Sequence, residues 1–406
     1  MKNKQVILWI ATVAFSLIYI IVGNKIASRD LGVLSNENSV SSKARVISID
    51  DTIKETFSFD GETEQTNIKT VFTCEILDGD YEGHKVKALQ SDDAMGMVSE
   101  KPVEVGDKIM ILNYSDQYYP EGDSDGVTVN WVFSRYVRFD TLMIFAIFFF
   151  VLVLIFGYTK GINTIISLGF TCAAIFLVYI PSILNGYNIY LSTLLNCAFI
   201  SLMSLLLITG WSRKTVTTVL GCMFGFLVAS LLSIILSSVL ELTGFVDEDS
   251  VYLTYLPTAT PIDLKAIIFG GVVIGSLGAV IDVAMDISSA LFELRRHAQN
   301  LPFNSLVKSG IAIGRDIIGT MANTLVLAYI GSALSTVLLL TTYEMSIEAL
   351  LNREMIIAEL LQALVGSTAI LLTIPLTSII CGFMYSKKQE EFPEEWEIPK
   401  NQQPKQ

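Results

Sequence analysis

Apolar runs of membrane-spanning length restrict the fold of this chain more than any other feature. Hydrophobic residues make up 52% of its 406 residues, and charged residues only 17%. A helix needs about 20 mostly apolar residues to cross a hydrocarbon core of roughly 30 Å, and several runs approach or exceed that length. The sequence therefore predicts a mainly α, polytopic membrane protein. About eight transmembrane helices are expected, at 1–23, 141–157, 162–184, 187–209, 214–240, 264–290, 314–341 and 354–385.

The charges between these runs predict the orientation of the chain, because lysine and arginine concentrate in cytoplasmic connections. With the N-terminus in the cytoplasm, the basic clusters fall on inner connections. The outer connections at 181–190, 241–263 and 341–354 then hold one arginine in total. Both termini are therefore predicted to be cytoplasmic. The inner connections carry Lys160, Arg213, Lys214, Arg295, Arg296, Lys308, Lys387 and Lys388.

The first run begins like a secretory signal peptide, with two lysines before a long apolar stretch. The stretch is long for a signal, and it has no convincing cleavage site with small residues. We interpret 1–23 as a retained N-terminal transmembrane anchor. A seven-helix transmembrane domain is expected at 141–385, followed by a cytoplasmic, disordered tail at 386–406, which is charged and contains proline.

The segment 24–140 is predicted to be a small extracytoplasmic all-β domain. Short stretches such as "ARVISI", "HKVKALQ" and "DKIMILNY" are β-branched and partly alternating, and Asp/Gly-rich turns separate them. Five or six strands of this length favour an OB-like barrel or a sandwich. We expect the turns to be structural, because they lack the twelve-residue pattern of a calcium loop.

Composition excludes several classes of partner and site. The net charge is −13, and the segment 24–140 holds 22 Asp and Glu against 12 Lys and Arg, which argues against a nucleic-acid partner. Four of the five cysteines lie in apolar runs, and Cys74 is alone in the β domain. No disulfide framework, metal site or cofactor is predicted from this pattern and two histidines.

The run from Asp263 to His297 carries its unusual residues on one helical face. At 3.6 residues per turn, its small and acidic residues fall within roughly 80° of one another. Glycines at a four-residue spacing also allow close helix packing. We expect this stripe to face protein or water, and the aliphatic residues, such as Val280, Val283 and Ile287, to face lipid. The stripe consists of Gly271, Gly275, Gly278, Asp282, Asp286, Ser289 and Glu293.

Two later helices carry matching polar faces. An ionisable side chain in mid-bilayer costs about 2.5–3.5 kcal/mol, so its presence needs a reason. One reason is structural: Asp282 or Asp286 pairs with Arg315 as a fixed bridge, Glu359 lies at the outer interface, and the glycines serve close packing. The other is a polar track across the bilayer that carries protons. The track would use Asp282 and Asp286, Arg315, Asp316 and Asn323 of the next long helix, and Glu359 and Gln362 of the last. Gly319 and Gly366, like Gly271, Gly275 and Gly278, are expected to serve helix packing.

Two blocks of sequence carry a family resemblance. "GSLGAVIDVAMDISSALFEL" and "IGRDIIGTMANTLVLAYIGSAL" closely resemble the YibE/F family of bacterial membrane proteins. The resemblance implies a protein of the bacterial cytoplasmic membrane, from a Gram-positive organism, with a transport-related role and no established substrate. A weaker likeness places Asp282 where the proton-driven SecD and RND exporters have their titrating aspartate. The chain lacks the duplicated half of those exporters, and its outer domain is small.

Two functions are predicted from different classes. The first is a proton-coupled transporter or exporter of unknown substrate, and the second is a non-transporting scaffold or assembly factor whose outer β domain binds a partner. An intramembrane enzyme is not expected, because the sequence has no Ser/His pair and no HExxH motif. The expected partners are the lipid bilayer and a second copy or a paralogous membrane subunit. A water-accessible cavity at Asp282 would favour transport over the scaffold.

Overall fold

The computed structural model forms two compact units, which comprise residues 1–31 with 153–406 and residues 32–152. The termini of the chain and several loops lie outside the part that is described, and the predicted tail lies there almost completely. The described residues are 2–29, 39–58, 64–92, 101–114, 131–256, 258, 260–298, 301–332, 334–342 and 346–386.

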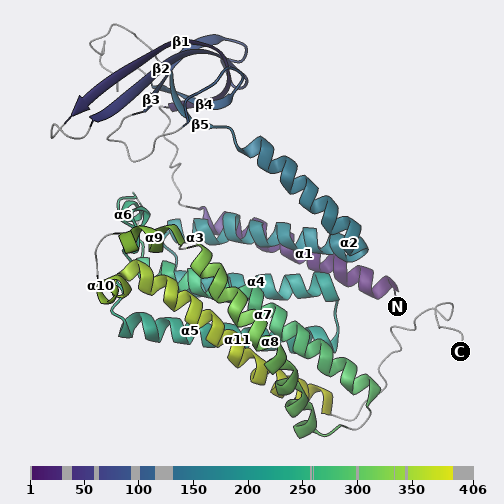
Figure 1. The fold of residues 1–406 in the computed structure, drawn as a ribbon. Helices are drawn as coiled ribbons and strands as arrows, with labels where there is room; N and C mark the ends of the chain where they lie inside the picture. The colour runs from purple at the N-terminus through teal and green to yellow at the C-terminus, as the bar shows by residue number, and fades with distance from the viewer. Residues whose placement is uncertain are drawn as a thin grey trace, which may run out of the picture. The chain divides into compact units, whose positions relative to one another are not determined.

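The smaller unit contains a five-stranded barrel in the order β1-β2-β3-β5-β4 (Figure 1). Neighbouring strands are antiparallel except β3 and β5, which are parallel. The predicted all-β domain is therefore a closed barrel and not a sandwich. Its strands are β1 (Ser39–Ser58), β2 (Glu64–Ile76), β3 (Lys85–Asp92), β4 (Lys108–Tyr114) and β5 (Trp131–Tyr136).

The first strand closes the ring, because it pairs with β4 over Ser39–Arg45 and with β2 from Ala44 onward. Register shifts between Val46 and Ser48 and between Ile49 and Asp51 bend it between its two neighbours. Beyond these shifts, β1 stays paired with β2 to Ser58, and from Glu55 to Ser58 it forms a two-stranded arm with residues 64–67, which lie beyond the last pair of β2 with β3.

Alternate side chains of the strands fill the barrel with an apolar core. Phe72, Ala88, Ile109 and Ile111 are completely buried, and so is Cys74. Burial raises the pKa of the Cys74 thiol to about 11, so the thiol stays protonated. The lone cysteine of this domain is therefore a small core residue.

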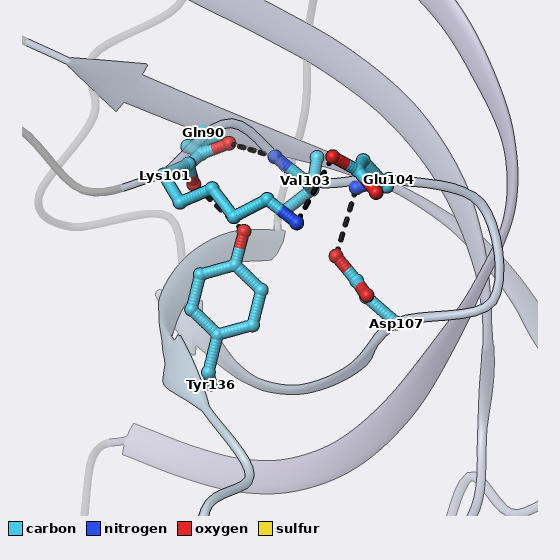
Figure 2. Close-up of polar contacts among 6 residues, drawn as sticks. All are labelled: Gln90, Lys101, Val103, Glu104, Asp107 and Tyr136. Atoms are coloured by element: carbon cyan, nitrogen blue, oxygen red, sulfur yellow. Dashed lines mark hydrogen bonds and ion pairs between the residues drawn. The ribbon is translucent and has the colours of Figure 1, made fainter.

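One end of the barrel is closed by the segment that precedes β4 (Figure 2). Gln90 is buried; its Nε2 donates to the carbonyl oxygen of Lys101 (3.1 Å), and its Oε1 accepts from the backbone N–H of Val103 (2.9 Å). The Tyr136 hydroxyl donates to the same Lys101 carbonyl (2.7 Å), and Asp107 accepts from the N–H of Glu104 (2.9 Å). These bonds hold an otherwise irregular segment against the strands.

The barrel is expected to fold without the helices. Residues 39–138 should express as a soluble, strand-rich unit, because the closed ring has its own core and depends on no disulfide. Far-UV circular dichroism and backbone amide dispersion in NMR would measure this. A helical spectrum, or folding only when calcium is added, would contradict the expectation.

The larger unit is helical, and seven of the described helical stretches are long and apolar enough to cross a membrane. Figure 1 shows α5, α7, α8 and α11 running alongside one another. The long helices are α1 (Lys2–Ala27), α2 (Phe139–Ala173), α4 (Ile189–Thr209), α5 (Arg213–Val239), α7 (Leu264–His297), α8 (Phe303–Ser332) and α11 (Glu354–Ser386). The short ones are η1 (Ala174–Tyr179), α3 (Ile180–Leu184), α6 (Glu248–Thr254), α9 (Leu334–Thr342) and α10 (Ile347–Leu351).

The count of seven takes residues 139–184 as one stretch, although the helix is interrupted inside it. This stretch, Phe139–Leu184, has 46 residues and contains the two runs predicted at 141–157 and 162–184. Inside it, Tyr158 leaves the helical region (φ 47°, ψ −126°). A Cβ on Gly161 would collide with the carbonyl oxygen of Val153, so the chain folds back closely on itself there.

The core of the helical unit lies where α5, α7 and α11 meet. Val280, Val283 and Ile287 of α7 are completely buried. On α5, a Cβ added to Gly225 would lie 2.7 Å from Val280 Cγ1 and would collide with Thr373 of α11. The three helices therefore approach one another closely enough that only glycine fits at this position.

The first helix packs against the same unit. The Trp9 Nε1 donates to Asn163 Oδ1 of α2 (3.1 Å), and the Tyr19 ring stacks on Phe199 of α4 with centroids 3.8 Å apart. These contacts make α1 part of the helical bundle.

Candidate functional site

The acidic–glycine stripe of α7 lies on the exposed side of that helix. Asp282 and Asp286 are exposed, whereas Val280, Val283 and Ile287 between and beside them are completely buried. The expectation that these aliphatic residues face lipid is therefore wrong. They form the packing surface for α5 and α11 at the level of the two acids. The same exposed face carries Gly271, Gly275 and Gly278.

The end of the stripe nearest the start of α7 is joined to two other helices by Gln362. Its Nε2 donates to the carbonyl oxygen of Gly271 on α7 (3.3 Å) and to the hydroxyl of Tyr329 on α8 (3.2 Å). A Cβ on Gly275 would lie 2.6 Å from Tyr329 Oη and 2.8 Å from Gln362 Nε2. The structure thus brings Gln362 to the stripe, and Glu359 lies half-buried about one turn away on α11.

A second glycine of the predicted site also serves packing. Gly366 of α11 is buried, and a Cβ there would lie 2.9 Å from Leu325 Cδ2 of α8 and 3.6 Å from Ser276 Cβ of α7. α7, α8 and α11 therefore meet here as well as at Gln362.

α7 and α8 touch a second time near their connection. A Cβ on Gly310 of α8 would lie 3.0 Å from Leu291 Cδ1 of α7. The two helices run antiparallel between this contact and the one at Tyr329, so residues between the contacts stand at matching depths. Asp286 is level with Arg315 and Asp316, and Asp282 is about one turn further out.

Between these two contacts, the facing surfaces of α7 and α8 are open. Added Cβ atoms on Gly278 of α7 and Gly319 of α8 would meet nothing within 4 Å. Arg315, Asp316 and Asn323 of α8 are exposed. The structure therefore leaves Gly278 and Gly319 unpacked, unlike Gly275 and Gly366.

The fixed bridge between the acids and Arg315 is not formed in the chain. Among the described residues, the ion pairs of α7 join Glu293 to Arg296 and to His297, both at 3.9 Å, and none joins Arg315 to Asp282 or Asp286. Lys214, near the start of α5, lies in electrostatic range of Asp286 and Glu293. Among the described residues, Asp282 and Asp286 take part in no ion pair.

A buried hydroxyl cluster near the start of α5 and the end of α11 was missed by sequence reasoning. Thr217 Oγ1 of α5 lies 2.6 Å from Ser288 Oγ of α7 and 2.8 Å from the Tyr385 hydroxyl of α11. Ser288 also donates to the carbonyl oxygen of Lys214 (3.1 Å). Single hydroxyls inside apolar helices have no distinctive spacing, so the meeting of these three could not be predicted from the sequence.

Comparison with known proteins gives one match. The family model described as YibE/F-like protein matches residues 145–387. That range includes every candidate site residue of α7, α8 and α11 and ends beyond the last described helix, whereas the barrel lies outside it. No curated protein and no solved structure matches the chain.

Proposed function

This chain belongs to the YibE/F-like protein family, and on that premise we propose that it is a proton-coupled membrane transporter or exporter with Asp282 as its titrating group. The observation that carries the proposal is the position of Asp282. It is exposed on a helix long and apolar enough to span a membrane, without an ion pair among the described residues. A structural role would have given it a fixed partner.

The chemistry required of a proton carrier fits this position. A carboxylate that is poorly hydrated can take up and release a proton near neutral pH, whereas one locked in an ion pair stays charged. In the proposed path Asp286 is the second carboxylate, and Arg315 and Asp316, at its depth, modulate the charge. Asn323, Gln362 and Glu359 continue the path towards the outer end.

The proposal includes the placement of the chain in the bacterial cytoplasmic membrane. Both termini are cytoplasmic in it, and the barrel domain, within 24–140, is extracytoplasmic and OB-like. The charges of the connections support this orientation, and the strand order with its parallel β3–β5 pair supports the OB-like assignment. The chain is not proposed to be an enzyme.

A scaffold function is the second candidate, and one observation favours it. The barrel has its own core and lies outside the range that the family model matches. Such a domain could bind a partner without any transport by the helices. The two candidates differ in whether Asp282 exchanges protons.

Labelling with dicyclohexylcarbodiimide tests the proposed function, because this reagent modifies protonated carboxyl groups in apolar surroundings. In purified protein reconstituted into liposomes, Asp282 should be modified faster as the pH falls from neutral to acidic, and mass spectrometry of peptides would locate the label. Asp263, which caps the first turn of α7, serves as the control and should stay unmodified. Equal labelling of both, or none at Asp282 across this range, would overturn the proposal.

A further inference from the structure

We propose that a second copy of this chain packs against the exposed face of α7 and α8 and places its own Arg315 beside Asp286. The shared face, called the α7–α8 face below, is defined by its exposed residues. They are Gly278, Asp282 and Asp286 of α7 and Arg315, Gly319 and Asn323 of α8.

The first argument is the cost of leaving this face to lipid. Asp282, Asp286, Arg315 and Asp316 are all exposed in the single chain, on helices long and apolar enough to span the bilayer. Each is unfavourable against hydrocarbon, because a charged side chain loses its hydration there. The face therefore requires a cover other than lipid, and this holds whether or not the chain moves protons.

The second argument is the shape of the face. Gly278 and Gly319 have open space where a side chain would be, whereas Gly225 and Gly310 of the same unit are already filled by neighbouring helices. Half of the apolar segment of α7 is buried within the chain, but only 6% of that of α8. α8 is thus a peripheral helix with a polar outer side, and small residues at such positions let another helix approach closely.

The third argument is charge complementarity at one depth. A two-fold axis along the membrane normal keeps every residue at its own depth and presents the same face from both copies. Only groups at equal depth can then pair, and Asp286 is level with Arg315. The planar guanidinium of the partner's Arg315 suits a carboxylate such as Asp286. Asp282, one turn away, keeps no cation and stays free to titrate.

The partner copy therefore completes the site assigned to the proposed function. It supplies an ion-pair partner for Asp286, which has none among the described residues of its own chain, and the two copies together separate Asp282 from lipid. The assembly itself can be tested without measuring transport, so its failure and the failure of the proposed function are distinguishable.

Photo-crosslinking in native membranes tests the assembly. Benzoylphenylalanine is placed at Leu327 of α8, which is 59% exposed, in a full-length chain that is co-expressed with a copy bearing a different epitope tag. Leu231 of α5, 60% exposed, is the matched control. We expect a product that carries both tags from Leu327 and little or none from Leu231.

A charge variant separates a specific interface from chance contact. Arg315→Gln should strongly reduce the crosslinked product and shift the mass of the protein in lipid nanodiscs from two chains to one, while Arg315→Lys keeps the charge and most of the product. Chain abundance in the membrane is measured in parallel, so that loss of folding is recognised. A product with a different membrane protein, equal products from Leu327 and Leu231, or a one-chain mass for the unmodified protein would overturn the proposal.

Discussion

Changing Asp282 to asparagine is expected to reduce proton flux through reconstituted vesicles to the level of vesicles without protein, while chain abundance in the membrane stays unchanged. Asparagine has almost the same shape as aspartate but cannot carry a proton. Asp282 has no ion pair among the described residues, so its neutralisation strands no buried cation. Flux is measured with a pH-sensitive dye inside the vesicles after an imposed pH gradient.

Two controls make this result interpretable. Ser289→Ala changes the same stripe without changing charge and should leave flux intact. The double variant Asp282→Asn, Arg315→Gln should stay inactive, because the loss lies in the missing proton carrier. If the single change instead lowers abundance and the double change restores both abundance and flux, the acid is one half of a structural bridge. Breaking such a buried pair costs roughly 3–5 kcal/mol, and the proton-carrier role would then be wrong.

Changing Gly225 to leucine is expected to destabilise the helical unit by about 3 kcal/mol, the upper end for overpacking a core. The added side chain would enter the point where α5, α7 and α11 meet, against Thr373 and Val280. Little relaxation is possible, because Val280 is completely buried. The loss is measured as a lower midpoint of thermal aggregation in detergent and as lower abundance in the membrane.

Gly169 on α2 provides the matched control for this change. It is also a glycine inside a membrane-length helix, but a Cβ there would meet nothing within 4 Å. Gly169→Leu should therefore leave the midpoint unchanged or raise it slightly, since leucine favours a helix more than glycine does. Equal losses for the two variants would show that the close approach of α5 does not limit stability.

The helices could be predicted because length and apolar composition determine them almost directly. The interruption between the predicted spans 141–157 and 162–184 is present at Tyr158, but its conformation, outside the helical region, could not be predicted. Tyrosine rarely adopts a positive φ, and the residue follows a glycine that gives no clear stop signal. The conformation of Tyr158 is decided by the packing of Gly161 against Val153, where the chain folds back. Sequence periodicity carries no information about that contact.

The stripe on α7 could be predicted as a stripe, but its direction could not. Periodicity shows which residues share a face and does not show which face meets the core. The prediction assigned the aliphatic side to lipid, although that side offers the larger apolar surface for α5 and α11. The sequence also contained Gly221 and Gly225 at the spacing of Gly271 and Gly275, and that signal of the real packing site was overlooked.

The candidate site was predicted at the level of helices and only partly at the level of contacts. Gln362 of α11 does reach Gly271 of α7, because the two residues lie at the same depth and glycine has no side chain in the way. Among the described residues, Arg315 forms no ion pair with Asp282 or Asp286. Such pairing depends on how each helix is rotated about its own axis, which composition does not specify. The contact among Thr217, Ser288 and Tyr385 depends on how α5, α7 and α11 are each rotated about their axes, so it could not be predicted either.

The two-stranded arm at the end of β1 gives the barrel an order of opening. Each strand of the closed ring has a partner strand on both sides, so the amide protons in these ladders exchange with solvent only when the ring itself opens. From Glu55 to Ser58, β1 pairs with residues 64–67 of β2, which have no pair with β3, and loss of these pairs leaves the ladders beside the core residues Phe72 and Ile109 in place. Local fraying therefore begins in the arm, and the barrel domain has a labile end attached to a slowly exchanging one.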